Sequence, residues 1–166
     1  MTKSETTFHN APQRHDRLLQ EREHDPYKSK SKLSDPTVCP ECGVVYHKGR
    51  WQWGETPADA NSELCPACHR VQDRVPSGFL HLSGDFFAEH QAEIMSTVRN
   101  VESKEKAEHP LKRIMAVESV DQGVTITFTD PHLARGCGEA VQSAYKGELD
   151  FAYQDGDRLL RVSWKR

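Results

Sequence analysis

The chain has 166 residues, a formal net charge of −3 and a pI near 6.3. This length suits one ordinary domain or two small ones, and the charge excludes a global positive field that would draw the protein onto nucleic acid. Because the sequence contains no run of about eighteen apolar residues and no apolar stretch near its start, it predicts a cytoplasmic protein without a membrane-spanning helix or a secretory signal.

The first 36 residues are predicted to form a flexible arm. Residues 1–36 carry few large apolar side chains and mix charges of both signs. They cannot bury enough apolar area to offset the entropy lost on ordering. Two interpretations remain open: Ala11–His24 becomes helical on a partner, or the whole arm stays a solvated tail.

Residues 37–82 are predicted to form a zinc ribbon. Cys39 and Cys42 make one C-x-x-C pair, Cys65 and Cys68 make a second, and twenty-two residues separate the pairs. Two such turns facing each other provide the tetrahedral four-sulfur cage that zinc prefers, and iron is the alternative. Four thiolates leave no place for water, so we expect one structural Zn²⁺ and no catalytic metal.

The loop Tyr46–Trp53, between the cysteine pairs, is a candidate RNA contact because cations alternate with flat rings. Lys48 and Arg50 would bind phosphate, and Trp51 or Trp53 would stack on bases. Alternatively, both tryptophans pack the small zinc core, which has few other large side chains.

Residues 83–110 are predicted to form a helix and a linker. Apolar side chains recur at helical spacing over residues 87–101. Ser83 or Asp85 is the expected N-cap, and Pro110 excludes continuation of the helix.

Residues 111–166 are predicted to form an α+β module with the order β-β-α-β-β. Ile114–Val120 is the first expected strand, and apolar residues alternate on the next. Asp130 is the expected N-cap of the helix, with Pro131 at its first position. The expected inward-facing residues are Val124, Ile126 and Phe128 on the second strand, Leu133, Cys137, Ala140, Val141 and Ala144 on the helix, and Leu160, Val162 and Trp164 on the last strand.

The sequence points to no catalytic residue. It contains no nucleotide-binding glycine motif and no nucleophile-elbow motif. Cys137 lies on an apolar helix face, which favours a core thiol over a nucleophile. Arg161 and Lys165 face outward on the last strand and join the candidate RNA contacts.

The two cysteine knuckles, the helix and the module that follows resemble the N-terminal zinc-binding region of the ribosome export adaptor (nonsense-mediated-decay-three-like) family of eukaryotes and archaea. The matching segments after the knuckles are Gly123–Phe128, His132–Gly136 and Lys146–Asp150. Small bacterial proteins of similar length share Cys-Pro-Glu-Cys-Gly, His-Lys-Gly-Arg-Trp and His-Leu-Ala-Arg. The resemblance spans about residues 38–166 and implies a non-enzymatic factor that contacts the large ribosomal subunit. Larger members have two zinc sites and further domains that this sequence lacks, so nuclear export is not implied.

The predicted function is therefore that of a cytoplasmic zinc-ribbon protein that binds ribosomal RNA or the large ribosomal subunit during assembly, quality control or dormancy. No small-molecule substrate is expected. The alternative is a protein–protein adaptor whose ribbon docks on a polymerase or another enzyme.

Overall fold

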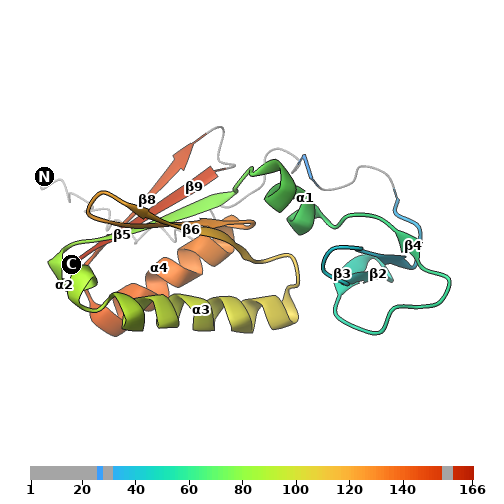
Figure 1. The fold of residues 1–166 in the computed structure, drawn as a ribbon, viewed down its shortest axis with the longest axis horizontal. Helices are drawn as coiled ribbons and strands as arrows, with labels where there is room; N and C mark the ends of the chain where they lie inside the picture. The colour runs from blue at the N-terminus through green and yellow to red at the C-terminus, as the bar shows by residue number, and fades with distance from the viewer. Residues whose placement is uncertain (1–25, 28–31, 155–158) are drawn as a thin grey trace, which may run out of the picture.

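The computed structural model describes residues 26–27, 32–154 and 159–166 (Figure 1). Within these ranges the chain forms two β-sheets and four helices. Most of the expected N-terminal arm lies outside the described residues. None of the helices in the described ranges is long and apolar enough to cross a membrane.

The first sheet belongs to a small unit that we call the cysteine module, residues 37–73. Its strand order is β3-β2-β1-β4, with β1 antiparallel to β2 and parallel to β4. The elements are β1 (Thr37–Val38), β2 (Val45–His47), β3 (Arg50–Gln52), β4 (Asn61–Ser62) and helix α1 (Pro66–Asp73).

Helix α1 was not predicted, although its start carries recognisable signals. Cys65 is the N-cap, and its sulfur accepts a hydrogen bond from the backbone N–H of Cys68. Pro66 occupies the first turn, where its missing N–H costs nothing. Arg74 ends the helix in the left-handed conformation, with φ of 55°. The second cysteine pair therefore sits on a helix N-terminus.

The second sheet belongs to a larger unit that we call the sheet–helix unit, residues 78–166. Its strand order is β6-β7-β5-β9-β8, in which β5 and β9 are parallel and every other neighbouring pair is antiparallel. The strands are β5 (Gly78–Ser83), β6 (Ile114–Val120), β7 (Gly123–Phe128), β8 (Glu148–Gln154) and β9 (Leu159–Lys165).

Strand β5 corrects the expected extent of the zinc ribbon. Residues 78–82 were expected to belong to the ribbon, but β5 lies at the centre of the second sheet and pairs with β7 and β9. Both edges of β5 thereby satisfy their backbone hydrogen-bonding groups, and Leu80 and Leu82 are fully buried in the core of this unit. The second sheet thus has five strands rather than the four expected.

The helical stretch expected over residues 83–110 is two helices rather than one helix and a linker. Helix α2 (Asp85–Glu89) and helix α3 (Gln91–Glu108) meet at His90. Gly84 is the N-cap of α2 in place of Ser83 or Asp85. Its φ is 103°, and the space where a Cβ would lie is filled by the backbone of Arg166, so glycine is required there.

Helices α3 and α4 (Pro131–Tyr145) lie side by side on one face of the second sheet (Figure 1). The N-cap prediction for α4 is confirmed, because the Asp130 carboxylate accepts from the backbone N–H of Leu133 at 3.1 Å. The buried face of α4 is slightly rotated from expectation, since Ala144 is exposed while Ala134 and Gly138 are buried. Inward-facing residues confirmed on the strands are Val124, Ile126, Phe128, Leu160, Val162 and Trp164.

The topology combines two split β-α-β crossovers. One runs from β5 through α2 and α3 to β6, with β7 between the two strands. The other runs from β7 through α4 to β8, with β5 and β9 between them. Both crossovers place a helix on the same sheet face (Figure 1), so a single apolar core forms between the helices and the sheet.

Candidate metal centre

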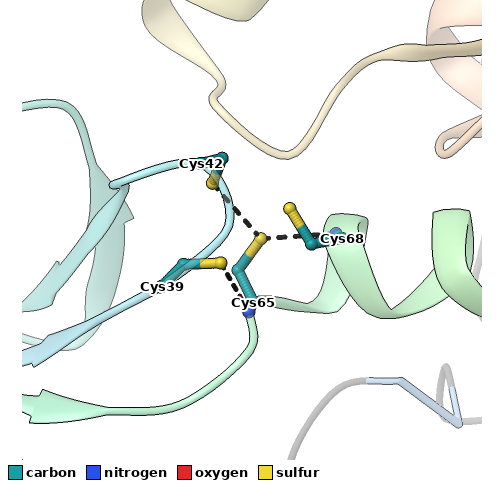
Figure 2. A group of neighbouring side chains, drawn as sticks. All are labelled: Cys39, Cys42, Cys65 and Cys68. Carbon is teal, nitrogen blue, oxygen red and sulfur yellow. Dashed lines mark hydrogen bonds between the residues drawn. The ribbon is translucent and has the colours of Figure 1, made fainter.

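The four predicted cysteine ligands converge on one point (Figure 2). Cys39 and Cys42 lie on the turn after β1, and Cys65 and Cys68 lie at the start of α1. Their sulfur atoms all lie within 4.8 Å of one another. Cys39 and Cys65 are almost completely buried, whereas Cys42 is half-buried.

This arrangement fits a tetrahedral metal ion. A Zn–S bond length of about 2.3 Å requires sulfur atoms about 3.8 Å apart, and the Cys42 and Cys65 sulfurs are 3.8 Å apart. No disulfide joins any of the cysteines. Soft sulfur donors suit zinc or iron and do not suit calcium or magnesium, which take oxygen ligands. The four cysteines can therefore bind one metal ion.

Backbone N–H groups of the cysteine module donate to the cysteine sulfurs and so stabilise their anionic form. The N–H of Cys65 points at the Cys39 sulfur at 3.3 Å, and the N–H of Cys68 points at the Cys65 sulfur at 3.4 Å. Gly43, with φ of 78°, closes the first turn by donating its N–H to the Cys39 carbonyl at 2.9 Å.

The thiol pKa values reflect two opposing effects. At Cys39, burial raises the pKa, but hydrogen bonds led by that from the Cys65 N–H outweigh it and lower the pKa to about 7. At Cys65 and Cys68, burial is the largest effect and raises the pKa. A bound metal cation would lower these pKa values, because its charge offsets both the burial of the thiolates and their mutual repulsion.

A buried arginine of the sheet–helix unit, Arg113, contacts this cluster. Its Nη1 donates to the Cys68 sulfur at 3.2 Å, and its Nη2 donates to the Cys42 sulfur at 3.1 Å. A longer contact of 3.9 Å joins Nη2 to the Cys65 sulfur. Arg113 is only 8% exposed. Burial opposes its charge, but its bond to Cys42 and the nearby thiolates raise its pKa overall.

The sulfur cluster supplies the counter-charge for Arg113. Among the residues that the structure describes, no carboxylate forms an ion pair with its guanidinium. An unpaired buried cation is strongly unfavourable, so this contact favours thiolates over neutral thiols. Four thiolates around a divalent metal ion would carry a net charge of −2, which Arg113 would reduce to −1. The sequence held no signal for this residue, which lies 45 positions beyond Cys68.

The two predicted phosphate-binding cations lie on the hairpin of β2 and β3. Lys48 and Arg50 are both exposed. The turn is held by Asp35, which accepts from the Lys48 backbone N–H at 2.9 Å and lies 2.7 Å from His47 Nδ1. These contacts lower the pKa of Asp35, with the bond to His47 as the largest cause.

The two tryptophans of the same loop have partners inside the protein. Trp51 packs against the core around the cysteines and meets the Tyr46 ring edge-on. Trp53 donates its indole N–H to the Lys106 carbonyl of α3 at 2.8 Å and remains 40% exposed. Because neighbouring side chains of a strand point to opposite faces, Arg50 and Trp51 do not share one surface.

Arg161 and Lys165 lie apart from that hairpin. Arg161 covers the Phe79 ring at 4.3 Å and donates to Gln154 at 2.7 Å. Lys165 is exposed at the end of β9, next to the C-terminus. Figure 1 places the C-terminus and the β2–β3 hairpin at opposite ends of the molecule. The six predicted RNA contacts therefore do not form one patch.

Cys137 lies in the apolar core of the sheet–helix unit, as its helical position predicted. Burial raises its pKa to about 12, which leaves almost no thiolate to act as a nucleophile near neutral pH.

No protein-family model, no curated protein and no solved structure matches this chain. The resemblance to the ribosome export adaptors therefore depends on the sequence segments alone.

Proposed function

We propose that this chain is a non-enzymatic zinc-ribbon protein that binds ribosomal RNA or the large ribosomal subunit, during assembly, quality control or dormancy. The observation that carries the metal half of the proposal is the convergence of four sulfur atoms within 4.8 Å. Four cysteine ligands fill a tetrahedral shell, so the ion has a structural role and leaves no open position for a substrate.

Zinc is the proposed metal because four-cysteine sites are its usual structural form. Iron, the alternative, would colour the protein, whereas Zn²⁺ has no d–d absorption. Elemental analysis with a visible absorption spectrum of the purified protein distinguishes the two. We expect one zinc per chain and no visible band.

The RNA half of the proposal rests on Lys48 and Arg50, together with the sequence resemblance. Both side chains are exposed on the β2–β3 hairpin of the cysteine module. The Asp35 carboxylate holds the turn of this hairpin by accepting from the Lys48 backbone N–H. Because the hairpin backbone is already folded, little backbone entropy is lost when its cations bind phosphate. Each contact also releases counterions from the polyanion, so a small local patch gains affinity despite the net charge of −3.

Co-sedimentation with purified large ribosomal subunits at two salt concentrations tests this half. Replacing Lys48 and Arg50 by alanine together should weaken binding and lower the slope of log affinity against log salt by roughly 1.4–1.8, at about 0.7–0.9 per lost contact. The matched control replaces Arg99 and Lys104, two exposed cations of α3, and should bind as the wild type does.

Two results would reject ribosome binding through this hairpin. In the first, wild-type protein remains at the top of the gradient at low salt, which favours the protein–protein adaptor. In the second, the hairpin variant and the control variant lose affinity equally, which shows that only total charge matters.

A further inference from the structure

We propose that Arg113 is an outer-sphere ligand of the metal centre, through which metal binding fixes the cysteine module to the sheet–helix unit. This inference depends on metal binding by the four cysteines and is independent of any ribosomal partner. It assigns a coupling role to a residue outside both C-x-x-C pairs.

The guanidinium of Arg113 bridges the two cysteine pairs. Nη2 reaches Cys42 of the first pair at 3.1 Å, and Nη1 reaches Cys68 of the second pair at 3.2 Å. The planar fork of arginine suits two acceptors at once, whereas lysine presents a single point charge. Both acceptors stay in place only while the two turns are held together, and a shared metal ion holds them so.

Arg113 is itself fixed to the sheet–helix unit. Its Nε donates to the Pro110 carbonyl at 2.8 Å, and its backbone N–H donates to Thr129 Oγ1 at 2.8 Å. Thr129 in turn donates its backbone N–H to the Arg113 carbonyl at 2.9 Å and its hydroxyl to the Leu111 carbonyl at 2.6 Å. The backbone of Arg113 is therefore fixed to Thr129, and the guanidinium can leave the sulfurs only if its bond to Pro110 breaks or the start of β6 moves.

A reciprocal contact runs from the cysteine module to the sheet–helix unit. The Trp53 indole donates to the Lys106 carbonyl at 2.8 Å, near the end of α3, and the Arg113 guanidinium lies 5.7 Å from the centre of its ring. Leu111 also packs against the core around the cysteines. Arg113 thus touches both the sulfur cluster and the ring that anchors the module to α3.

Two indole protons report on this coupling separately. The Trp53 indole N–H crosses between the units, whereas the Trp164 indole N–H donates to the Lys146 carbonyl at 2.6 Å inside the sheet–helix unit. In the full-length, ¹⁵N-labelled protein, hydrogen exchange at both can be followed by NMR. Chelation of the metal should speed exchange at Trp53 at least about tenfold and leave Trp164 protected.

The decisive variant is Arg113→Met, whose zinc affinity is measured first and whose hydrogen exchange is then measured at saturating zinc, so that the site is filled. We expect zinc affinity, measured by competition with a chromogenic chelator, to fall about 10–100-fold, as for other outer-shell partners. Exchange at Trp53 should rise while Trp164 is unchanged. Arg70→Met is the matched control, because Arg70 is equally buried but its Nη1 donates to the Val75 carbonyl rather than to sulfur.

Arg113→Lys provides a second variant that keeps the charge and should recover part of the lost affinity. The inference is overturned if Arg113→Met binds zinc within twofold of wild type and keeps Trp53 protected. It is also overturned if Arg70→Met reproduces both effects. Wild-type protein that binds no zinc would instead reject the proposed metal function itself, so the two failures are distinguishable.

Discussion

Truncation of Trp164 tests the core of the sheet–helix unit. The ring is fully buried, and a Cβ added to Gly147 would lie 2.8 Å from its indole nitrogen, so the ring is tightly packed on that side. Trp164→Ala should therefore leave a large cavity and cost about 3–5 kcal/mol of unfolding free energy. The lost hydrogen bond to the Lys146 carbonyl adds little, because water can reach that partly buried site.

Urea unfolding followed by circular dichroism measures this cost. With a dependence of about 2 kcal/mol per molar urea, a loss of about 4 kcal/mol moves the midpoint down by about 2 M. Trp164→Phe keeps most of the ring volume and removes the N–H, so it should cost only about 1–2 kcal/mol. A Trp164→Ala midpoint within about 0.5 M of wild type would refute the packing argument.

The remaining predictions concern α4 and the metal. Gly138→Ala should destabilise the protein by about 1–3 kcal/mol, because the new Cβ would lie 2.7 Å from Val162. A Cβ added at Gly136 would meet no other atom, so Gly136→Ala should stabilise the same helix by up to about 1 kcal/mol. Equal shifts in melting temperature for the two glycine variants would contradict both predictions. Cys42→Ser and Cys65→Ser should each abolish zinc binding, measured by elemental analysis against the one zinc per chain expected for the wild type, and a variant that retains stoichiometric zinc would exclude that cysteine as a ligand. Chelation should speed amide exchange in β2 and β3 while β5 stays protected, and loss of protection in β5 as well would place that strand with the cysteine module after all.

Local patterns predicted the second half of the chain well. Alternating apolar residues on β7 and β9 face one core because a strand has a period of two, and the structure buries Ile126 and Val162 as expected. Asp130 caps α4, since its carboxylate satisfies a backbone N–H that no carbonyl can reach. Gly147 follows the end of that helix with a φ of 91°, which glycine adopts without strain. Each of these features depends on residues close together in sequence.

Features that depend on distant contacts were missed. In β5, Leu80 and Leu82 show the alternation of a half-buried strand, but Phe79, which lies between Gly78 and Leu80, is a large apolar residue on the outward face. Its position is explained only by its cation–π contact with Arg161, which the sequence does not show. The nearby cysteine pair also favoured assignment of this stretch to the ribbon. The strand's place between β7 and β9 is a property of the whole sheet. No local period encodes it.

The candidate site shows the same division between local and distant information. The spacing of the cysteines identifies the ligands, because a C-x-x-C turn carries its own geometry. Arg113 is invisible to that reasoning, since its contact with Cys42 spans 71 positions. Trp53 was expected either to stack on an RNA base or to pack the zinc core, yet its N–H is bonded to α3. An aromatic residue beside cations can thus hold two units of a protein together as readily as it can stack on an RNA base.

The position of Trp53 changes where a ribosomal contact should be sought. Its indole N–H is bonded at the junction with α3 and the Arg113 guanidinium lies over its ring, so base stacking on that covered face would require the two units to separate. Phosphate contact through Lys48 and Arg50 needs no such change, because both are exposed on the hairpin. Zinc-dependent ribosome binding would then arise from the rigidity that the metal gives to this hairpin. Wild-type and Arg113→Met proteins, both saturated with zinc, should accordingly bind large subunits with similar affinity. A much weaker complex with the variant would show instead that the partner contacts both units at once.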